Sequence, residues 1–202
     1  MKRATLITLG LAGCFGLSLM GWGGWWLTGV GLAVAVGVFA YSAGPFPLST
    51  RGWGEVAVVF FFGIIPVNLT YYVQTLQWNV PVAMASVAVG LMGANVLIVN
   101  NYRDREDDLA VGKRTLCVRW GHQAMRALYM ANAVAAALLL LPAWIPLGWR
   151  GWPVAVAYVT LSWRIEEEMK TRSGAALTPL LGATSLLMAG VALALLFLGY
   201  RV

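Results

Sequence analysis

Residues 80–108 read VPVAMASVAVGLMGANVLIVNNYRDREDD, an apolar run that leads directly into a group of charged side chains. The apolar part, residues 80–101, is long enough to cross the hydrocarbon layer of a bilayer, which takes about 20 residues of helix. Asn100, Asp104 and Asp108 then recur at every fourth position. On a helix this spacing stacks one amide and two carboxylates on the same face. The stretch therefore predicts a membrane helix with a polar site at one end.

The composition of the whole chain also indicates a membrane protein. Hydrophobic residues make up 60% of the 202 residues and charged residues 11%, whereas a soluble domain carries roughly 25% charged residues. Seven segments are candidate membrane spans: residues 4–20, 24–43, 55–75, 80–101, 126–147, 151–165 and 176–199. We expect an all-α fold, a polytopic transmembrane helical bundle of about seven spans that forms one integral-membrane domain over residues 1–202.

The basic residues predict an orientation in the membrane. Of the 14 Lys and Arg residues, only Arg150 and Arg201 fall on the outer side if the N-terminus is cytoplasmic, which agrees with the positive-inside rule. The eight acidic residues fall on the cytoplasmic side as well. We expect a multi-pass protein of the cytoplasmic (inner) membrane with its charged site facing the cytoplasm. The net charge of +6 then reflects topology and attraction to anionic lipid, and the sequence shows no nucleic-acid-binding pattern.

The charged loop after residue 101 has two possible explanations. A solvated run of charges is the usual one, but it does not account for Asn95, Asn100 and Asn101 at the end of a span, where buried polar groups are costly and tend to mark function. Hard cations such as Mg²⁺ take oxygen ligands, often one or two carboxylates together with substrate phosphates. We therefore interpret the face formed by Asn100, Asp104 and Asp108 as a site for Mg²⁺ and a diphosphate.

A resemblance to a known family rests on three segments in the same order. Residues 100–121, NNYRDREDDLAVGKRTLCVRWG, resemble the second aspartate motif of the UbiA-type membrane prenyltransferases. Residues 44–55, GPFPLSTRGWGE, and residues 71–74, YYVQ, are similar to one branch of that superfamily at matching distances upstream. That branch is the 1,4-dihydroxy-2-naphthoate polyprenyltransferases of menaquinone synthesis. The resemblance covers essentially the whole chain.

The resemblance also implies features that the chain lacks. Members of the superfamily have about nine transmembrane helices and an earlier aspartate motif, whereas this chain has no Asp or Glu before Glu55. The segment from Met1 resembles the third helix of the family. We therefore expect an N-terminally truncated member without the first two helices, which has little turnover alone or receives those helices from a separate polypeptide.

The implied activity is an enzymatic one, the transfer of a polyprenyl group from a polyprenyl diphosphate to an aromatic acceptor in the bilayer, with Mg²⁺ as the cofactor. The resemblance implies that Asp104 and Asp108 are catalytic and bind the metal together with Asn100. It implies diphosphate contacts from Asn101, Arg103, Lys113, Arg114, Arg51 and Tyr41. Tyr72 and Gln74 are predicted to line the acceptor pocket, although Tyr71, Tyr72 and Gln74 are equally compatible with an aromatic belt at the far membrane face. Arg119 and His122 are interpreted as lipid-facing or structural.

Other functions stay open at the level of sequence. The chain could be a non-catalytic membrane protein that binds isoprenoid diphosphates or quinones. It could also be a prenyltransferase that acts on another aromatic quinone precursor. A small transporter is a further alternative, since polar residues occur within the spans, but it requires internal repeats, and the sequence contains none.

Overall fold

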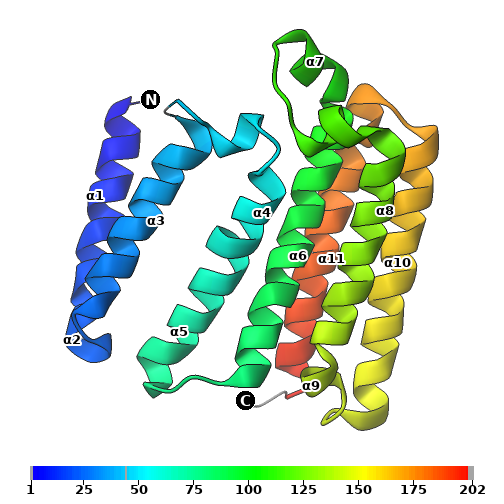
Figure 1. Cartoon of the computed structure of the whole chain (residues 1–202). Helices are drawn as coiled ribbons and strands as arrows, with labels where there is room; N and C mark the ends of the chain where they lie inside the picture. Colours follow the sequence, from blue (N-terminus) through cyan, green and yellow to red (C-terminus); the bar gives the residue numbers. More distant parts are fainter. Residues whose placement is uncertain (1, 44, 200–202) are drawn as a thin grey trace.

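The computed structural model describes residues 2–43 and 45–199, and every regular element in those residues is a helix. Long helices run side by side between two ends of the molecule (Figure 1). The connection between α3 and α4, the short helix α7 and the connection between α10 and α11 lie at one end, which we call the charged end. The short helices α2 and α9 and the connection between α5 and α6 lie at the opposite end.

The bounds of the helices follow the chain in order. The first part contains α1 (Lys2–Ser18), α2 (Met20–Gly23), α3 (Trp26–Ser42) and the 3₁₀ turn η1 (Leu48–Thr50). One continuous helical segment then consists of α4 (Gly54–Val58), the π-helical η2 (Val59–Ile64) and α5 (Ile65–Thr75). The remainder contains α6 (Val80–Arg103), α7 (Arg105–Ala110), α8 (Leu116–Leu139), α9 (Leu141–Trp144), η3 (Gly148–Arg150), α10 (Gly151–Thr171), η4 (Gly174–Leu177) and α11 (Thr178–Phe197).

The predicted fold class, an all-α membrane bundle, is confirmed. Within the described residues, three helical segments are long and apolar enough to cross a membrane, namely Gly54–Thr75, Val80–Arg103 and Gly174–Phe197. Trp26–Ser42 is a shorter apolar helix. Each predicted span corresponds to a helix. Arg201, which the sequence places on the outer side, lies outside the described residues.

The ends of two predicted spans differ from the structure. The span predicted at 126–147 corresponds to α8, which begins at Leu116, is interrupted at Gly121, where φ is 77° and ψ is 172°, and ends at Leu139, just before the short α9 with Pro142 in its first turn. The span predicted at 151–165 continues to Thr171. Ion pairs one turn apart, such as Arg172–Glu168, stabilise its polar last turns, and a prediction based on apolar length alone misses them.

Helix α6 is the centre of the packing. It contacts α8, η2, α11, α4 and α5 along its length. Near the charged end its Ile98, Val99 and Tyr102 pack with Met125 of α8 and Met169 of α10 in one buried cluster. A second buried cluster, around Trp144, occupies the other half of the bundle. The residues that follow α6 are therefore attached to the best-packed helix of the chain.

Two glycines allow a close helix crossing in the bundle. Gly63 of η2 faces Gly90 of α6, and a Cβ atom at Gly90 would lie 2.7 Å from the carbonyl oxygen of Val59. A Cβ atom at Gly63 would collide with the backbone of Gly90. Small residues allow such close backbone approach between membrane helices. This crossing fixes the segment from Gly54 to Thr75 against α6 and so positions the start of α4 beside the end of α6.

The polar residue Asn95 has a structural explanation. Its Nδ2 donates to the backbone oxygen of Tyr129 at 3.0 Å, and its Oδ1 accepts from Nδ2 of Asn132 at 3.0 Å. All three residues are buried. Interhelical hydrogen bonds of this kind each contribute roughly 0.6 kcal/mol in membrane proteins. Asn95 therefore joins α6 to α8, some way along the helix from the charged residues.

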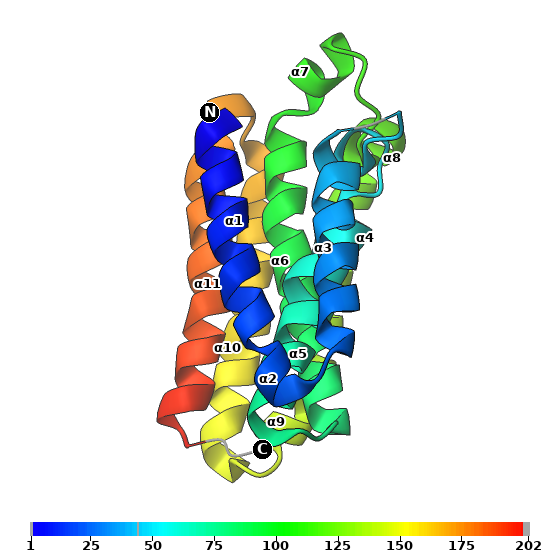
Figure 2. The ribbon, with the colours of Figure 1, turned by 90° about the vertical axis from the view of Figure 1, so that its left-hand side faces the viewer.

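The hairpin of α1 and α3 lies at one side of the bundle. Figure 1 shows it beside α4 and α5, and Figure 2 shows the same hairpin from its outer side, in front of α6 and α11. Its α3 contacts η1 and packs Gly37 against the ring of Phe61 in η2, and the turn α2 contacts α5. Large apolar side chains such as Phe15, Leu32 and Phe39 are exposed on it, as expected for a surface in contact with lipid.

Candidate functional site

The predicted site lies at the charged end, where α6 passes into α7 (Figure 1). The interpretation of Asn100, Asp104 and Asp108 assumes helical spacing, and the structure has an interruption there: Asp104 has φ −94° and ψ 9° and separates α6 from α7. The helical hydrogen bonds nevertheless continue: the Asp104 amide donates to Asn100 O at 3.0 Å and the Asp108 amide to Asp104 O at 2.8 Å. The two aspartates are therefore one turn apart, as the spacing predicts.

Asp104 is paired with the arginine that precedes it. Arg103 donates from Nε to Oδ1 of Asp104 at 2.6 Å and from Nη2 to Oδ2 at 2.9 Å. The same Nη2 donates to Oδ1 of Asn100 at 2.9 Å. The hydrogen bond from Arg103 lowers the pKa of Asp104 below its usual range, and the charge of Lys113 acts in the same direction. Asp104 is thus an anion in a bidentate ion pair with the Arg103 guanidinium.

Asp108 is the buried member of the pair, with 5% of its surface exposed. Lys113 donates from Nζ to Oδ1 of Asp108 at 2.6 Å. The hydrogen bond to Asp108 raises the pKa of Lys113, and the negative charges of Asp108 and Asp104 both add to this effect. Lys113 is therefore the cationic partner of Asp108, and the charge of Asp104 also acts on it.

A third acidic residue lies below this pair, and the sequence did not assign it to the site. Glu55, in the first turn of α4, accepts through Oε1 from Nδ2 of Asn101 at 2.9 Å. Both side chains are buried, and Oε2 of Glu55 has no hydrogen-bond partner among the described residues. The amide of Asn101 is thus used to join α6 to α4, and its predicted contact with a diphosphate stays a prediction. The signal for Glu55 is an ionisable residue within the first turn of an apolar span.

The carboxylate pair and Asn100 offer oxygen atoms, which are the ligands that Mg²⁺ takes in proteins. Asn100, Asp104 and Asp108 supply oxygen atoms on successive turns. No group of three His, Cys, Asp or Glu side chains converges within residues 2–43 and 45–199. Mg²⁺ is often held by one or two carboxylates together with the phosphates of a substrate. The residues therefore fit an ion that shares its ligands with a bound diphosphate, provided that Arg103 and Lys113 release the carboxylates.

The predicted diphosphate residues fall into two groups. Arg103 and Lys113 contact the carboxylates, whereas Arg51 and Arg114 line a separate cavity of about 460 Å³. Arg119, predicted to be structural or lipid-facing, lines the same cavity. We call these three arginines the arginine cradle. Its other lining residues are Pro47, Thr50 and Gly112.

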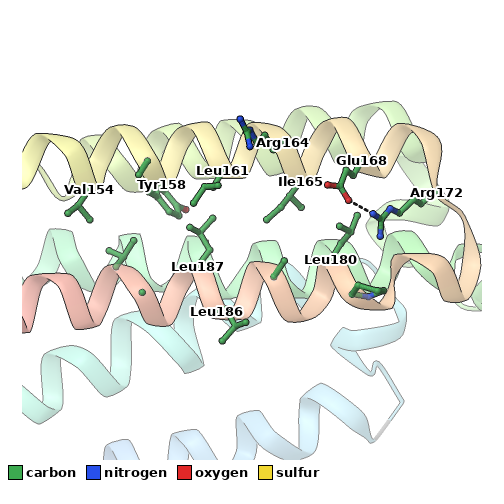
Figure 3. A pocket seen from close by; sticks show the side chains of 15 residues that line it. Val154, Tyr158, Leu161, Arg164, Ile165, Glu168, Arg172, Leu180, Leu186 and Leu187 are labelled. Carbon is green, nitrogen blue, oxygen red and sulfur yellow. Dashed lines mark ion pairs between the residues drawn. The ribbon is translucent and has the colours of Figure 1, made fainter.

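A larger cavity lies on another face, in the groove between α10 and α11 (Figure 3). Its volume is about 740 Å³, and its lining is mostly apolar, with side chains such as Tyr158, Ile165 and Leu187 directed into the groove. The ion pair between Glu168 and Arg172 lies at its charged end. None of the predicted site residues lines it.

The comparison with known proteins identifies the family. The model of the UbiA prenyltransferase family matches residues 2–175, which include both the aspartate pair and the arginine cradle. The chain belongs to the UbiA prenyltransferase family.

Curated relatives of this UbiA-family chain are similar over most of its length. It is 33% identical over 186 residues to the 1,4-dihydroxy-2-naphthoate octaprenyltransferase of Mycobacterium leprae, which covers 92% of the chain and 63% of the relative. It is 33% identical over 197 residues to the protein of the same name from Mycobacterium tuberculosis, which covers 95% of the chain and 65% of the relative. It is 28% identical over 167 residues to the 2-carboxy-1,4-naphthoquinone phytyltransferase of a Synechocystis strain, over 77% of the chain and 51% of the relative. No solved structure gives a significant match.

The chain therefore spans 63% to 65% of the length of the two mycobacterial relatives. The matched part contains the aspartate pair, the arginine cradle and the aromatic residues of α5. The activity, substrates and partners of the whole relatives are accordingly a matter of proposal for this UbiA-family chain.

The predicted acceptor residues lie far from the aspartate pair in this UbiA-family chain. Tyr72 and Gln74 are in the last part of α5, at the end of the bundle opposite α7 (Figure 1). The ring of Tyr72 stacks on Trp78 with centroids 5.0 Å apart and meets Trp26 edge-on at 5.1 Å. This aromatic cluster supports the interpretation of an interfacial belt. The acceptor role of both residues stays a prediction.

Tyr41 lies nearer to the carboxylates. Its hydroxyl approaches Gly54 at the start of α4, within 3.9 Å of where a Cβ atom would lie. That position is next to Glu55, the partner of Asn101. Tyr41 is therefore at the charged end, on the α3 side of the site, and its predicted contact with a diphosphate stays a prediction.

Proposed function

We propose that this UbiA-family chain binds a polyprenyl diphosphate with Mg²⁺ at its charged end, and that its activity is the transfer of the polyprenyl group to 1,4-dihydroxy-2-naphthoate in menaquinone synthesis. The observation that carries the proposal is the aspartate pair, one turn apart at the end of the central helix and faced by Lys113. The names of the mycobacterial relatives support the choice of acceptor. The apolar helices support a membrane location, and we place the charged end in the cytoplasm because it collects the basic residues.

The chemistry separates into a leaving-group half and an acceptor half. The bond between the allylic carbon and the diphosphate oxygen breaks, pyrophosphate leaves with the bonding electrons, and the allylic carbon forms a bond to an electron-rich ring carbon of the acceptor. That ring carbon then releases the group it carried, a proton or, at the carboxyl-bearing position, carbon dioxide, so that the ring becomes aromatic again. A bound Mg²⁺ would neutralise the charge that develops on the leaving oxygen. Asp104, Asp108 and Asn100 are the residues that would hold the ion.

The residues of the chain itself perform the binding step. If the carboxylates ligated a cation, Arg103 and Lys113 would lose their present partners and would be free to donate to phosphate oxygens. Such charge-assisted hydrogen bonds are roughly twice as strong as neutral ones. The ion pairs seen here thus hold these cations next to the position where a diphosphate would enter.

A second candidate function is favoured by one observation. Each aspartate already has a cation as partner, and within the described residues no third acidic side chain converges on them. A site with a single carboxylate pair can bind an isoprenoid diphosphate and still be slow to cleave it. The chain would then be a non-catalytic isoprenoid-diphosphate or quinone-binding membrane protein.

Binding and turnover should be measured on the same sample of the full chain in lipid nanodiscs. The probes are geranylgeranyl diphosphate, 1,4-dihydroxy-2-naphthoate and Mg²⁺, with the prenylated product detected by mass spectrometry. We expect Mg²⁺-dependent binding that Asp108→Asn weakens and that Asp107→Asn, a change at an exposed acid on the same short helix, leaves unchanged. Binding with product supports the proposed enzyme, and binding without product supports the second candidate. Binding that is absent, or equal with and without Mg²⁺, contradicts both.

A further inference from the structure

The arginine cradle brings three guanidinium groups to one cavity. Arg51 lies in the loop before α4, whereas Arg114 and Arg119 lie on either side of the start of α8, some sixty residues further along the chain, yet all three line the same space of about 460 Å³. Among the described residues, none of the three has a carboxylate within ion-pair distance. By contrast, Arg103, Arg105, Arg126 and Arg172 at the same end of the molecule each have one.

Backbone contacts hold these like charges together. The amide of Arg114 donates to the backbone oxygen of Thr50 at 2.7 Å. Gly52, at φ +78°, lies so close that a Cβ atom there would be 3.1 Å from Arg114 O and 3.3 Å from Arg119 Nε. Only glycine adopts this backbone conformation at little cost. The loop of residues 48–53 is thus docked on the start of α8, and the docking sets the arginines side by side.

Arg51 is held in place within its own loop. Its Nη2 donates to the backbone oxygen of Pro45 at 3.2 Å, and its guanidinium lies over the ring of Phe46, 4.2 Å from the centroid. Such a cation–π contact restricts the orientation of the side chain. The two contacts restrict the orientation of this exposed side chain, which lowers the entropy lost on binding.

The cradle is a different site from the carboxylate pair. The short segment from Gly112 to Arg114 divides the two: Lys113 turns to Asp108, whereas Gly112 and Arg114 line the cavity. No acidic residue lines the cavity. A divalent cation is repelled there, and an anion is attracted.

We propose that Arg51, Arg114 and Arg119 form a metal-independent binding site for a phosphate-type anion. Arginine is the residue that suits such a ligand, because its planar fork donates two parallel hydrogen bonds to phosphate oxygens. The ligand is either free pyrophosphate or the headgroup of an anionic lipid. The site goes beyond the proposed function, since it requires neither Mg²⁺ nor the aspartates, and it gives Arg119 a binding role.

The test measures binding of inorganic pyrophosphate, in the presence of EDTA, to the purified full chain in neutral nanodiscs. We expect Arg119→Gln and Arg114→Gln each to weaken binding roughly ten-fold or more, the effect of removing one charge-assisted hydrogen bond. Arg119→Lys keeps the charge without the fork and should give an intermediate loss. Arg164→Gln, at an exposed arginine of α10, is the matched control and should bind as the wild type does.

A second arm distinguishes the source of the phosphate group. The melting temperature is measured in nanodiscs of phosphatidylglycerol and of phosphatidylcholine. If pyrophosphate does not bind, but phosphatidylglycerol raises the melting temperature of the wild type and not of Arg119→Gln, the ligand is the lipid headgroup. If neither ligand distinguishes Arg119→Gln from Arg164→Gln, the proposal is overturned. The aspartate variants should lose Mg²⁺-dependent binding of geranylgeranyl diphosphate and should still bind pyrophosphate. Failure of the aspartate site can then be distinguished from failure of the cradle.

Discussion

The carboxylate pair and the arginine cradle lie on either side of one short loop and differ in how their charges are balanced. At the pair, each aspartate has a cation of its own chain at 2.6 Å. In the cradle, three cations are held together by backbone contacts with no anion of the described chain between them. A pair that is already neutralised can exchange its partner for a metal ion, whereas a cluster of like charges requires a ligand of opposite sign. The difference predicts a cation on one side of the loop and an anion on the other.

The largest expected change in stability comes from the hydrogen bond between Asn101 and Glu55 at the charged end. Glu55→Leu removes the acceptor for the buried amide of Asn101, and leaving one buried donor without a partner costs roughly 1–3 kcal/mol. We expect a lower free energy of unfolding, measured by denaturant titration in detergent micelles, together with weaker Mg²⁺-dependent diphosphate binding. Glu55→Gln keeps an acceptor at the same place and is the control. If Glu55→Leu weakens pyrophosphate binding at the cradle as much as it weakens Mg²⁺-dependent binding, the two sides are not separate.

Removal of the Lys113 ammonium group tests the carboxylate pair through a gain in metal affinity. Lys113→Met takes away the cation that competes with a metal ion for Asp104 and Asp108. We expect the affinity for Mn²⁺, titrated without diphosphate by electron paramagnetic resonance, to rise about ten-fold, which corresponds to about 1.4 kcal/mol. Arg114→Met removes a cation from the cradle side and should leave Mn²⁺ affinity unchanged. An equal rise in both variants would mean that the loop responds only to its net charge.

The smallest expected effect concerns pH. Because Arg103 lowers the pKa of Asp104, the carboxylate is ionised throughout the neutral range. The stabilisation that comes from this pair is therefore complete above the unfolded pKa of about 3.9, and it is lost only as the pH falls through the lower folded value. The pair is partly exposed, so we expect Asp104→Asn to change the free energy of unfolding by less than about 1 kcal/mol. That difference should be constant from pH 6 to pH 8, and a slope across this range would contradict the assignment.

The parts of this fold that sequence can predict are those that depend on local pattern. The apolar lengths predict the long helices, and the i, i+4 spacing predicts that Asp104 and Asp108 lie one turn apart. Both follow from the period of the helix, which needs no knowledge of the tertiary structure. The break at Asp104 and the extension of α10 to Thr171 depend on side-chain pairs, and hydropathy does not report these.

The contacts between distant segments were not predictable from the sequence. Nothing local indicates that Asn101 donates to Glu55, because this contact depends on how α4 packs against α6. Nor does anything local indicate that Arg119 lines the same cavity as Arg51, which depends on how two loops dock at the end of the bundle. For Arg119, five residues after Arg114 and at the start of a helix, the sequence favoured a structural or lipid-facing role. Its position in the cavity depends on Gly52, whose positive φ brings the preceding loop against it.

The proposed function requires that the aspartate pair hold a divalent ion together with a polyprenyl diphosphate. The most direct test is the equilibrium binding of geranylgeranyl diphosphate to the full chain and to the double variant Asp104→Asn with Asp108→Asn, each measured with Mg²⁺ and with EDTA. We expect Mg²⁺ to strengthen binding to the wild type by roughly a hundred-fold, about 2.7 kcal/mol, and to have no effect on the double variant. Equal enhancement by Mg²⁺ in both proteins would contradict the proposed function.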